Sequence, residues 1–216
     1  MSWFTRTVTA SLGKKYIMAL SGLVLGAFLL VHAAGNTTIL LGRSAFLSYA
    51  GHLHAFDFAL VGIEFLLLAF FLAHVVTGLV LFMQNMWARP ERYAVNNNAG
   101  GRTWGSATMP YTGIIVFLFI LVHLYNFHFI APGAVIADVV AEVLGSPLYT
   151  VLYGIGLTAL ALHISHGFWS LFQSAGINHP KYNRFIIVCA WVIGGLIIAV
   201  FGIIVVMLLV NSNLLA

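Results

Sequence analysis

The sequence predicts an all-α integral membrane protein with five transmembrane helices, because it is too apolar for a chain surrounded by water. Charged residues make up only 6% of the chain and hydrophobic residues 62%, so a polar surface could not cover a core of this size. The 216 residues have room for about five spans of roughly 20 to 30 residues with short connections. No separate soluble domain fits, and residues 1–216 are expected to form a single transmembrane domain.

Apolar runs between polar residues place the five helices along the chain. The predicted ranges are 16–41, 57–87, 110–131, 147–175 and 184–211. The first run follows Arg6, Lys14 and Lys15 but continues without a small-residue cleavage site, which predicts a retained helix rather than a signal peptide.

The basic residues indicate how these helices are oriented. Five spans place the termini on opposite sides, and only Arg43 then lies on the side away from the N-terminus. The positive-inside rule predicts a cytoplasmic N-terminus in a multi-pass protein of the cell inner membrane. Because these residues flank the spans, the net charge of +4 reports topology and does not indicate a nucleic-acid partner. The basic residues on the N-terminal side are Arg6, Lys14, Lys15, Arg89, Arg92, Arg102, Lys181 and Arg184.

The single cysteine limits the redox chemistry that the chain can carry by itself. Cys189 lies in an apolar run, so an intrachain disulfide, a cysteine cluster and covalent C-x-x-C-H haem attachment are all excluded. The chain also lacks a Rossmann fingerprint, so it shows no sequence signature for binding a dinucleotide cofactor by itself.

Four histidines lie inside the first four predicted spans, one in each. Ionisable side chains at such depths normally face the bundle and carry function. Counted from the outer helix ends, His32 and His123 lie about 9 and 8 residues deep, whereas His74 and His163 lie about 17 and 16 deep. The four histidines therefore form two layers, separated by about 12 Å along the membrane normal.

Two layers of paired histidines predict two b-type haems stacked across the membrane. A bis-histidine haem needs two imidazoles at one height on facing helices, which a four-helix bundle supplies. A zinc or copper site would need three or four ligands converging on one point. His166 competes with His163 as a ligand, but His163 matches the depth of His74 better. Glycines at Gly78 and Gly167 follow both deeper histidines by four residues and are expected to leave room for a porphyrin edge.

Other polar residues are candidates for roles beside the haems. His52 and His54, expected in the outer loop, are candidates for the outer haem propionates, as Ser21, Trp169 and Gln173 are for the inner haem. The alternative for the loop histidines is contact with water or headgroups, which would also suit His128 and His179 near helix ends. Glu64 is the only carboxylate inside a span, and it is expected to be buried, level with the outer haem, as a group that exchanges protons.

These residues resemble the diheme cytochrome b membrane-anchor subunits of succinate dehydrogenase and quinol:fumarate reductase, the succinate:quinone oxidoreductase family. The resemblance covers essentially the whole chain, and the histidine spacing of 42, 49 and 40 residues is similar to the family's. The segments that carry it are Gly13-Lys14-Lys15 through Ser21-Gly22 to His32-Ala-Ala-Gly35-Asn36, and His163-Ile-Ser-His-Gly167-Phe-Trp-Ser-Leu-Phe-Gln173 through Asn178-His-Pro180-Lys181-Tyr182.

The resemblance implies a role in electron transfer. In such proteins His74 and His163 would hold the inner haem and His32 and His123 the outer one, the same pairing that depth gives. Electrons would pass between a membrane quinone, by analogy menaquinone, and an iron–sulfur subunit that serves a flavoprotein subunit carrying FAD. A dimer of such complexes is a further expectation. Some members have a glutamate just before the inner ligand of the fourth span, but here Ala161 and Leu162 precede His163.

Two alternatives remain open at this point. One is the cytochrome b subunit of another quinone-linked dehydrogenase, which the segment from His163 to Lys181 fits poorly. The other is a transporter or membrane proton relay that uses the intramembrane histidines. A transporter predicts an internal repeat or broken helices, and neither is evident from the hydropathy pattern.

Overall fold

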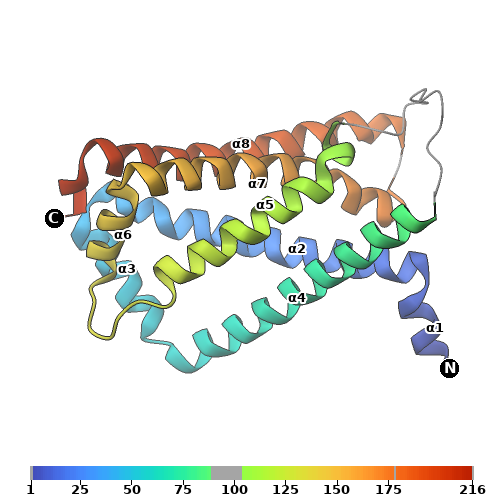
Figure 1. Ribbon diagram of the computed structural model, residues 1–216, viewed down its shortest axis with the longest axis horizontal. Coiled ribbons are helices and arrows are strands. Elements are labelled where there is room, and N and C mark those ends of the chain that lie inside the picture. Colours follow the sequence, from blue (N-terminus) through green and yellow to red (C-terminus); the bar gives the residue numbers. More distant parts are fainter. Residues whose placement is uncertain (1, 89–103, 178, 216) are drawn as a thin grey trace.

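The chain is all-helical in its computed structural model, which describes residues 2–88, 104–177 and 179–215 (Figure 1). Those residues contain no strand, so the predicted all-α fold is confirmed. The helices are α1 (Trp3–Thr9), α2 (Ser11–Asn36), η1 (Thr37–Leu41), α3 (Arg43–His54), α4 (Asp57–Trp87), α5 (Trp104–Phe127), α6 (Ile136–Gly145), α7 (Pro147–Ser174), α8 (Pro180–Val210) and η2 (Ser212–Leu215).

Five of these helices are long and apolar enough to cross a membrane, as predicted. They are Ser11–Leu41, Phe58–Trp87, Trp104–Phe127, Pro147–Ser174 and Pro180–Val210. Many of their large apolar side chains are exposed, which is the arrangement a bilayer requires because lipid tails, and not water, surround the helices. Much of the predicted inner loop, including Arg89, Arg92 and Arg102, lies outside the described residues, as does Asn178.

Three predicted helix starts are wrong by several residues: the first span begins at Ser11 and not at residue 16, and the other two differ at a proline. The third span begins at Trp104, so Pro110 lies inside the helix and not at its start. Proline removes one helical hydrogen bond, but tertiary packing holds the first turns: a Cβ on Gly105 would lie 2.7 Å from the Cβ of His166 on α7. The fifth span begins at Pro180, where the His179 side chain accepts a hydrogen bond from the Lys181 backbone N–H and so caps the helix.

Two short helices, α3 and α6, occupy segments that were expected to be loops. On α6, the side chains of Ala137, Val140 and Leu144 are buried, a spacing that places them on one helical face. They join the hydrophobic core cluster at the C-terminal end of the bundle, together with Leu208 of α8 and Leu215 of η2. The best-packed part of the described protein therefore lies at this end.

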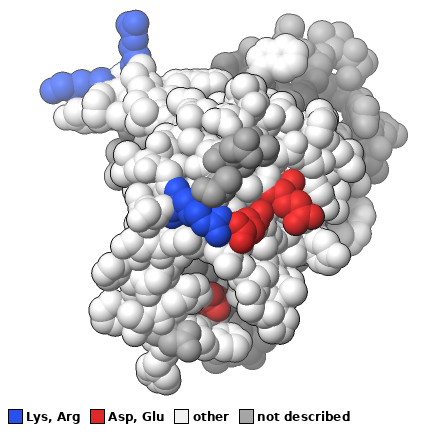
Figure 2. All heavy atoms as spheres, turned by 90° about the vertical axis from the view of Figure 1, so that its left-hand side faces the viewer, with Lys and Arg blue, Asp and Glu red and all other residues white. Residues whose placement is uncertain are grey.

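An ion pair closes the same end of the bundle. Arg43 of α3 donates through Nη1 to the carboxylate of Asp138 on α6 and to the carbonyl of Leu215. Figure 2 shows these basic and acidic side chains in contact on the end face. The contact ties together three segments that lie far apart in the sequence.

The long helices contact one another in a defined order. Helix α2 packs against α4 and α7, α5 packs against α7, and α7 packs along α8. In Figure 1, α2 and α5 run from the N-terminal end of the bundle toward the other end, and α4 and α7 run back. The four histidine-bearing helices are therefore two antiparallel pairs, and α8 lies outside them against α7.

Candidate haem-binding site

His74 of α4 and His163 of α7 face each other nearer the N-terminal end of the bundle. Their ring centroids lie 6.3 Å apart, and the ring planes are inclined by 68°. Both side chains are partly buried. His166, the alternative to His163, lies at a different contact, where its Cβ packs against Gly105 of α5.

A buried serine determines the tautomer of His74. The Ser21 hydroxyl donates to the carbonyl of Ile17 at 2.6 Å and lies 3.0 Å from Nδ1 of His74. Serine has a single hydroxyl proton, and the bond to Ile17 uses it. The Ser21 oxygen must therefore accept from Nδ1–H of His74, which leaves Nε2 of that ring unprotonated and able to bind a metal.

A buried threonine determines the tautomer of His163 in the same way. The Thr112 hydroxyl lies 3.2 Å from the Thr108 carbonyl and 3.1 Å from the Met109 carbonyl, and donates to this backbone. Its oxygen lies 3.3 Å from Nδ1 of His163 and is left to accept the ring N–H. Both histidines of this pair therefore carry the proton on Nδ1 and keep Nε2 free for a ligand bond.

His32 of α2 and His123 of α5 form a second pair. Their ring centroids lie 5.8 Å apart, with the ring planes at 89°. Phe28 stacks on His32 at 5.4 Å, and Tyr153 approaches His123 at 6.2 Å. The aromatic rings around the pair restrict both imidazoles and keep the surroundings apolar.

The polar contacts of this second pair differ from those of the first. Nδ1 of His123 is buried and has no hydrogen-bond partner. At the other histidine of the pair, the Asn36 amide donates to the backbone carbonyl of His32 at 2.8 Å and lies 3.5 Å from Nδ1 of the His32 ring. No hydroxyl contact to either ring is present in the part of the chain that the structure describes.

The two pairs lie at separate levels of the bundle. On α2, Ser21 contacts His74, and His32 follows Ser21 by 11 residues, which is roughly 16 Å of helix. On α5, Thr112 contacts His163, and His123 again follows by 11 residues. The structure thus brings together the same two pairs, in two layers, that the depth count predicts.

The spacing of both pairs fits an iron between two imidazoles. Each metal–nitrogen bond takes about 2 Å, and a ring centre lies about 1 Å beyond its nitrogen, so the two centres should be roughly 6 Å apart. The observed 6.3 and 5.8 Å agree with this requirement. Among the described residues no group of three or more His, Cys, Asp or Glu converges as a zinc site would need, so the donor sets fit a planar macrocycle with two axial ligands.

An internal repeat relates the two halves of the site, contrary to the expectation that none was present. Residues 18–32 read MALSGLVLGAFLLVH and residues 109–123 read MPYTGIIVFLFILVH, with Met, Gly, Phe, Leu, Val and His identical. The helices that follow carry H-x-x-x-G-x-x-x-x-x-Q twice, at residues 74–84 and 163–173. Ser21 therefore corresponds to Thr112, and each histidine pair contains equivalent residues from the two halves.

Sequence reasoning missed Thr112, and this repeat is the signal that would have found it. The depths of the histidines give no information about Thr112, whereas an alignment of the two halves makes Thr112 the equivalent of Ser21. Because the repeat exists, its supposed absence no longer separates an electron carrier from a transporter. The other feature expected of a transporter is not seen, since α2, α4, α5 and α7 are each assigned as one continuous helix.

The glycines that lie next to the imidazole rings differ from those that follow the deeper histidines. A Cβ on Gly78 or Gly167 would lie 3.6 Å from the methyl group of Met18 or Met109, an ordinary contact distance, so the porphyrin-edge role of these two glycines stays a prediction. The glycines next to the imidazoles are Gly22 and Gly113. A Cβ at these positions would approach Cε1 of His74 and of His163 to 3.3 and 3.4 Å.

The remaining predicted residues have varied positions. His52 and His54 lie on helix α3 and not in a loop, and both are exposed; a hydrogen bond of 2.6 Å joins Nδ1 of His52 to the Ser48 carbonyl. Gln173 has a buried amide nitrogen without a partner, and Trp169 lies one turn earlier on α7, partly buried. Glu64 is exposed on α4, so the expectation that it is buried is wrong.

These features define a class of protein: a multi-pass helical membrane protein with two histidine pairs at two levels of its bundle. The chain is similar to the succinate dehydrogenase cytochrome b558 subunit of Bacillus subtilis (strain 168), with 28% identity over 166 residues, which is 74% of this chain and 77% of that protein. The predicted resemblance to the membrane anchors of the succinate:quinone oxidoreductase family is thereby confirmed. No family model matches the chain, and no solved structure matches it.

Proposed function

We propose that this chain is the diheme cytochrome b membrane anchor of a succinate:quinone or quinol:fumarate oxidoreductase. It transfers electrons between a membrane quinone and an iron–sulfur subunit that serves an FAD-containing flavoprotein. The observation that carries the proposal is the pairing of four intramembrane histidines at two levels, each pair with the ring spacing that one iron needs. The name of the Bacillus subtilis relative supports the identity of the complex.

The two pairs have defined roles in this proposal. His74 and His163 would hold the inner haem through Nε2, while the hydroxyl oxygens of Ser21 and Thr112 accept hydrogen bonds from the Nδ1–H groups of these histidines. His32 and His123 hold the outer haem in an aromatic surrounding that excludes water. When bound, haem supplies reversible one-electron transfer. The four histidines would hold the two haems in a fixed orientation and in an apolar medium. Haems at the two levels would give electrons a route between the two faces of the membrane.

The orientation assigned to the chain follows its basic residues. A cytoplasmic N-terminus puts the level of His74 and His163 on the side of the soluble subunits. Lys14 and Gln84 join α2 to α4 there, with 2.6 Å between Nζ and Oε1. The loop 88–109, most of which lies outside the described residues, and the N-terminal segment are proposed to offer Arg, Asn and Gly groups for contact with the soluble subunits.

The quinone site is proposed near the outer haem, with Glu64 as its proton acceptor. Quinone reduction consumes two protons for every two electrons, so a titratable group beside the electron donor is required. Glu64 is exposed on α4 and is therefore accessible to a lipid-soluble substrate or to water. The outer location and menaquinone as the quinone both rest on the resemblance.

The proposal is tested by purifying the chain from membranes and recording its spectrum and its bound partners. We expect reduced b-type bands and co-isolation of a flavoprotein and an iron–sulfur protein. A colourless protein would exclude every cytochrome and favour the proton relay. A coloured protein that is isolated with a hydrogenase or formate dehydrogenase would assign it to another quinone-linked enzyme.

A further inference from the structure

Buried polar side chains are rare in this protein, and their positions are informative. In the described part of the chain they are Ser21, Thr112 and Asn126. The exposed fractions of Ser21 and Thr112 are only 2% and 6%, and each contacts one histidine of the same pair. Buried hydroxyls in an apolar interior need partners, so their contact with the two rings calls for a physical account.

We infer that Ser21 and Thr112 are matched positioning residues for the haem held by His74 and His163. Each accepts Nδ1–H from the histidine of its own half of the repeat, which fixes the tautomer and the rotation of the ring. Together they set the redox potential of that haem. The inference deepens the proposed function and rests on it.

Because of their bonds to the backbone, both hydroxyls can only accept a hydrogen bond from a histidine ring. Ser21 and Thr112 each donate their only proton to a carbonyl of the preceding helical turn, so neither can donate to an imidazole. A ring that rotated by 180° about its Cβ–Cγ bond would present Cδ2 to the hydroxyl oxygen and lose the hydrogen bond. The adjacent glycines, Gly22 and Gly113, let the rings lie against the helix backbone, so each ring is held on two sides.

The effect should be confined to one of the two haems. Nδ1 of His123 has no partner, and Nδ1 of His32 reaches only Asn36 at 3.5 Å. The repeat therefore supplies hydroxyl acceptors at one level and not at the other. This asymmetry gives each variant an internal reference in the same molecule.

Loss of the acceptor has a predictable sign. A hydrogen bond from Nδ1–H increases the basicity of Nε2 and favours the more positively charged metal. Removing it should favour the reduced haem and raise its midpoint potential. A several-fold change in the oxidised-to-reduced ratio, at most about tenfold, corresponds to at most about 59 mV for one electron.

The experiment is a redox titration of the intact complex carrying Thr112→Val, Ser21→Ala, Ser21→Thr or Thr112→Ser. Valine matches threonine in shape, so Thr112→Val removes little besides the hydroxyl. Ser21→Ala removes the corresponding hydroxyl beside His74 and should shift the potential in the same direction. Ser21→Thr and Thr112→Ser exchange the hydroxyls that the two halves already use, and should keep the native potential.

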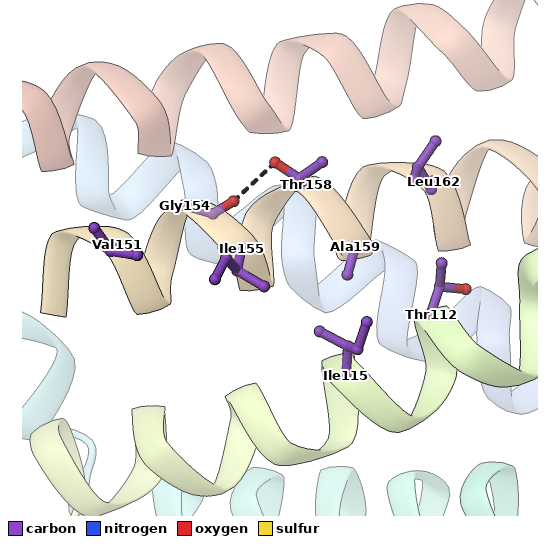
Figure 3. A pocket seen from close by; sticks show the side chains of 8 residues that line it. All are labelled: Thr112, Ile115, Val151, Gly154, Ile155, Thr158, Ala159 and Leu162. Carbon is purple, nitrogen blue, oxygen red and sulfur yellow. Dashed lines mark hydrogen bonds between the residues drawn. The ribbon is translucent and has the colours of Figure 1, made fainter. Parts of the chain in front are cut away.

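A matched control is available on α7. The Thr158 hydroxyl also bonds the carbonyl four residues earlier, at 2.8 Å from the Gly154 oxygen, but it contacts no histidine. Figure 3 shows it with Thr112 at a shallow pocket of about 440 Å³ between α5 and α7. Thr158→Val should leave both potentials unchanged.

Each outcome decides the inference. An upward shift of one haem in Thr112→Val, with the other haem and Thr158→Val unchanged, supports it. A Thr112→Val complex that keeps both haems with unchanged potentials and an unchanged low-spin EPR signal overturns it, while leaving the proposed function intact. If the Val and Ala variants fail to assemble, Ser21→Thr and Thr112→Ser decide, because failure of these exchanges to retain the native haem also overturns it.

Discussion

The ring of Phe119 on α5 lies directly over Gly156 on α7. A Cβ on Gly156 would lie 2.4 Å from Cγ and Cδ2 of that ring, a distance that atoms cannot adopt. The centroid of the same ring lies 6.0 Å from the ring centroid of His123 and 5.2 Å from that of Tyr153. The close approach of α5 and α7 at this level therefore also fixes the position of the Phe119 ring beside His123.

Gly156→Ala should consequently lower the thermal unfolding temperature, since Phe119 must move away from its contacts. Overpacking of this kind costs about 1–3 kcal/mol. The control is Gly154→Ala on the same helix, where a Cβ would meet nothing within 4 Å and should be neutral or slightly stabilising. Thermal unfolding followed by circular dichroism compares the two, and equal midpoints would contradict the packing seen here.

Acid should weaken the contact between Arg43 and Asp138. The hydrogen bond that Arg43 donates lowers the pKa of the Asp138 carboxyl and raises that of the guanidinium. The folded-state pKa of Asp138 thus lies below its unfolded value. Its stabilising effect is complete above the unfolded pKa and is lost as pH falls through the folded pKa.

Asp138→Asn should therefore lower the unfolding midpoint slightly at neutral pH, and the difference from the unsubstituted protein should shrink in acid. Both side chains are partly exposed, so the effect is small. Glu142→Gln on the same helix is the control, because no ion pair of Glu142 is present among the described residues. A pH-independent difference for Asp138→Asn would contradict the assignment.

Glu64→Gln tests the proposed proton acceptor, because glutamine keeps the shape and hydrogen-bonding capacity but cannot take up a proton. We expect both haems to remain and succinate oxidation with a soluble artificial acceptor to persist. Quinone-linked turnover should fall by at least about tenfold, within the range for losing a general acid or base. Unchanged quinone-linked turnover with intact haems would remove Glu64 from the mechanism.

Protease protection in sealed vesicles tests the membrane orientation. A cytoplasmic N-terminus predicts that the loop 88–109 is on the cytoplasmic side, so protease should cleave this loop in inverted vesicles. Cleavage only from outside right-side-out vesicles would reverse the assigned topology.

Hydropathy predicts the spans well where polar residues bound the apolar run. The second span was predicted as 57–87 and forms Asp57–Trp87, because Asp57 and the polar residues after Trp87 interrupt the apolar run. The predicted starts of the third and fifth spans were wrong because each lies near a proline. A helix supported by its neighbours continues past Pro110. The short helices α3 and α6 were missed because their stability comes from packing on the bundle end, which a length criterion cannot detect.

The candidate site was only partly predictable, for a geometric reason. Depth along a helix follows from residue counting, so the pairing of His32 with His123 and of His74 with His163 could be predicted. Contacts around the helix axis depend on how each helix is rotated, and for this reason the contacts of Thr112, Gly113 and Phe119 were missed, although the repeat marks Thr112 as the equivalent of Ser21. The exposure of Glu64 was missed for the same reason, since an apolar stretch does not say which side faces the bundle.

The most direct test of the two-haem proposal is the haem content and redox titration of the protein and its four single histidine-to-alanine variants. We predict two b-type haems per chain, with His74→Ala and His163→Ala losing one spectral component and His32→Ala and His123→Ala losing the other. In the proposed arrangement each histidine would supply one of two axial bonds to its haem. If His74→Ala and His32→Ala lost the same component, or if the unsubstituted chain bound no haem, the two-level arrangement proposed here would be contradicted.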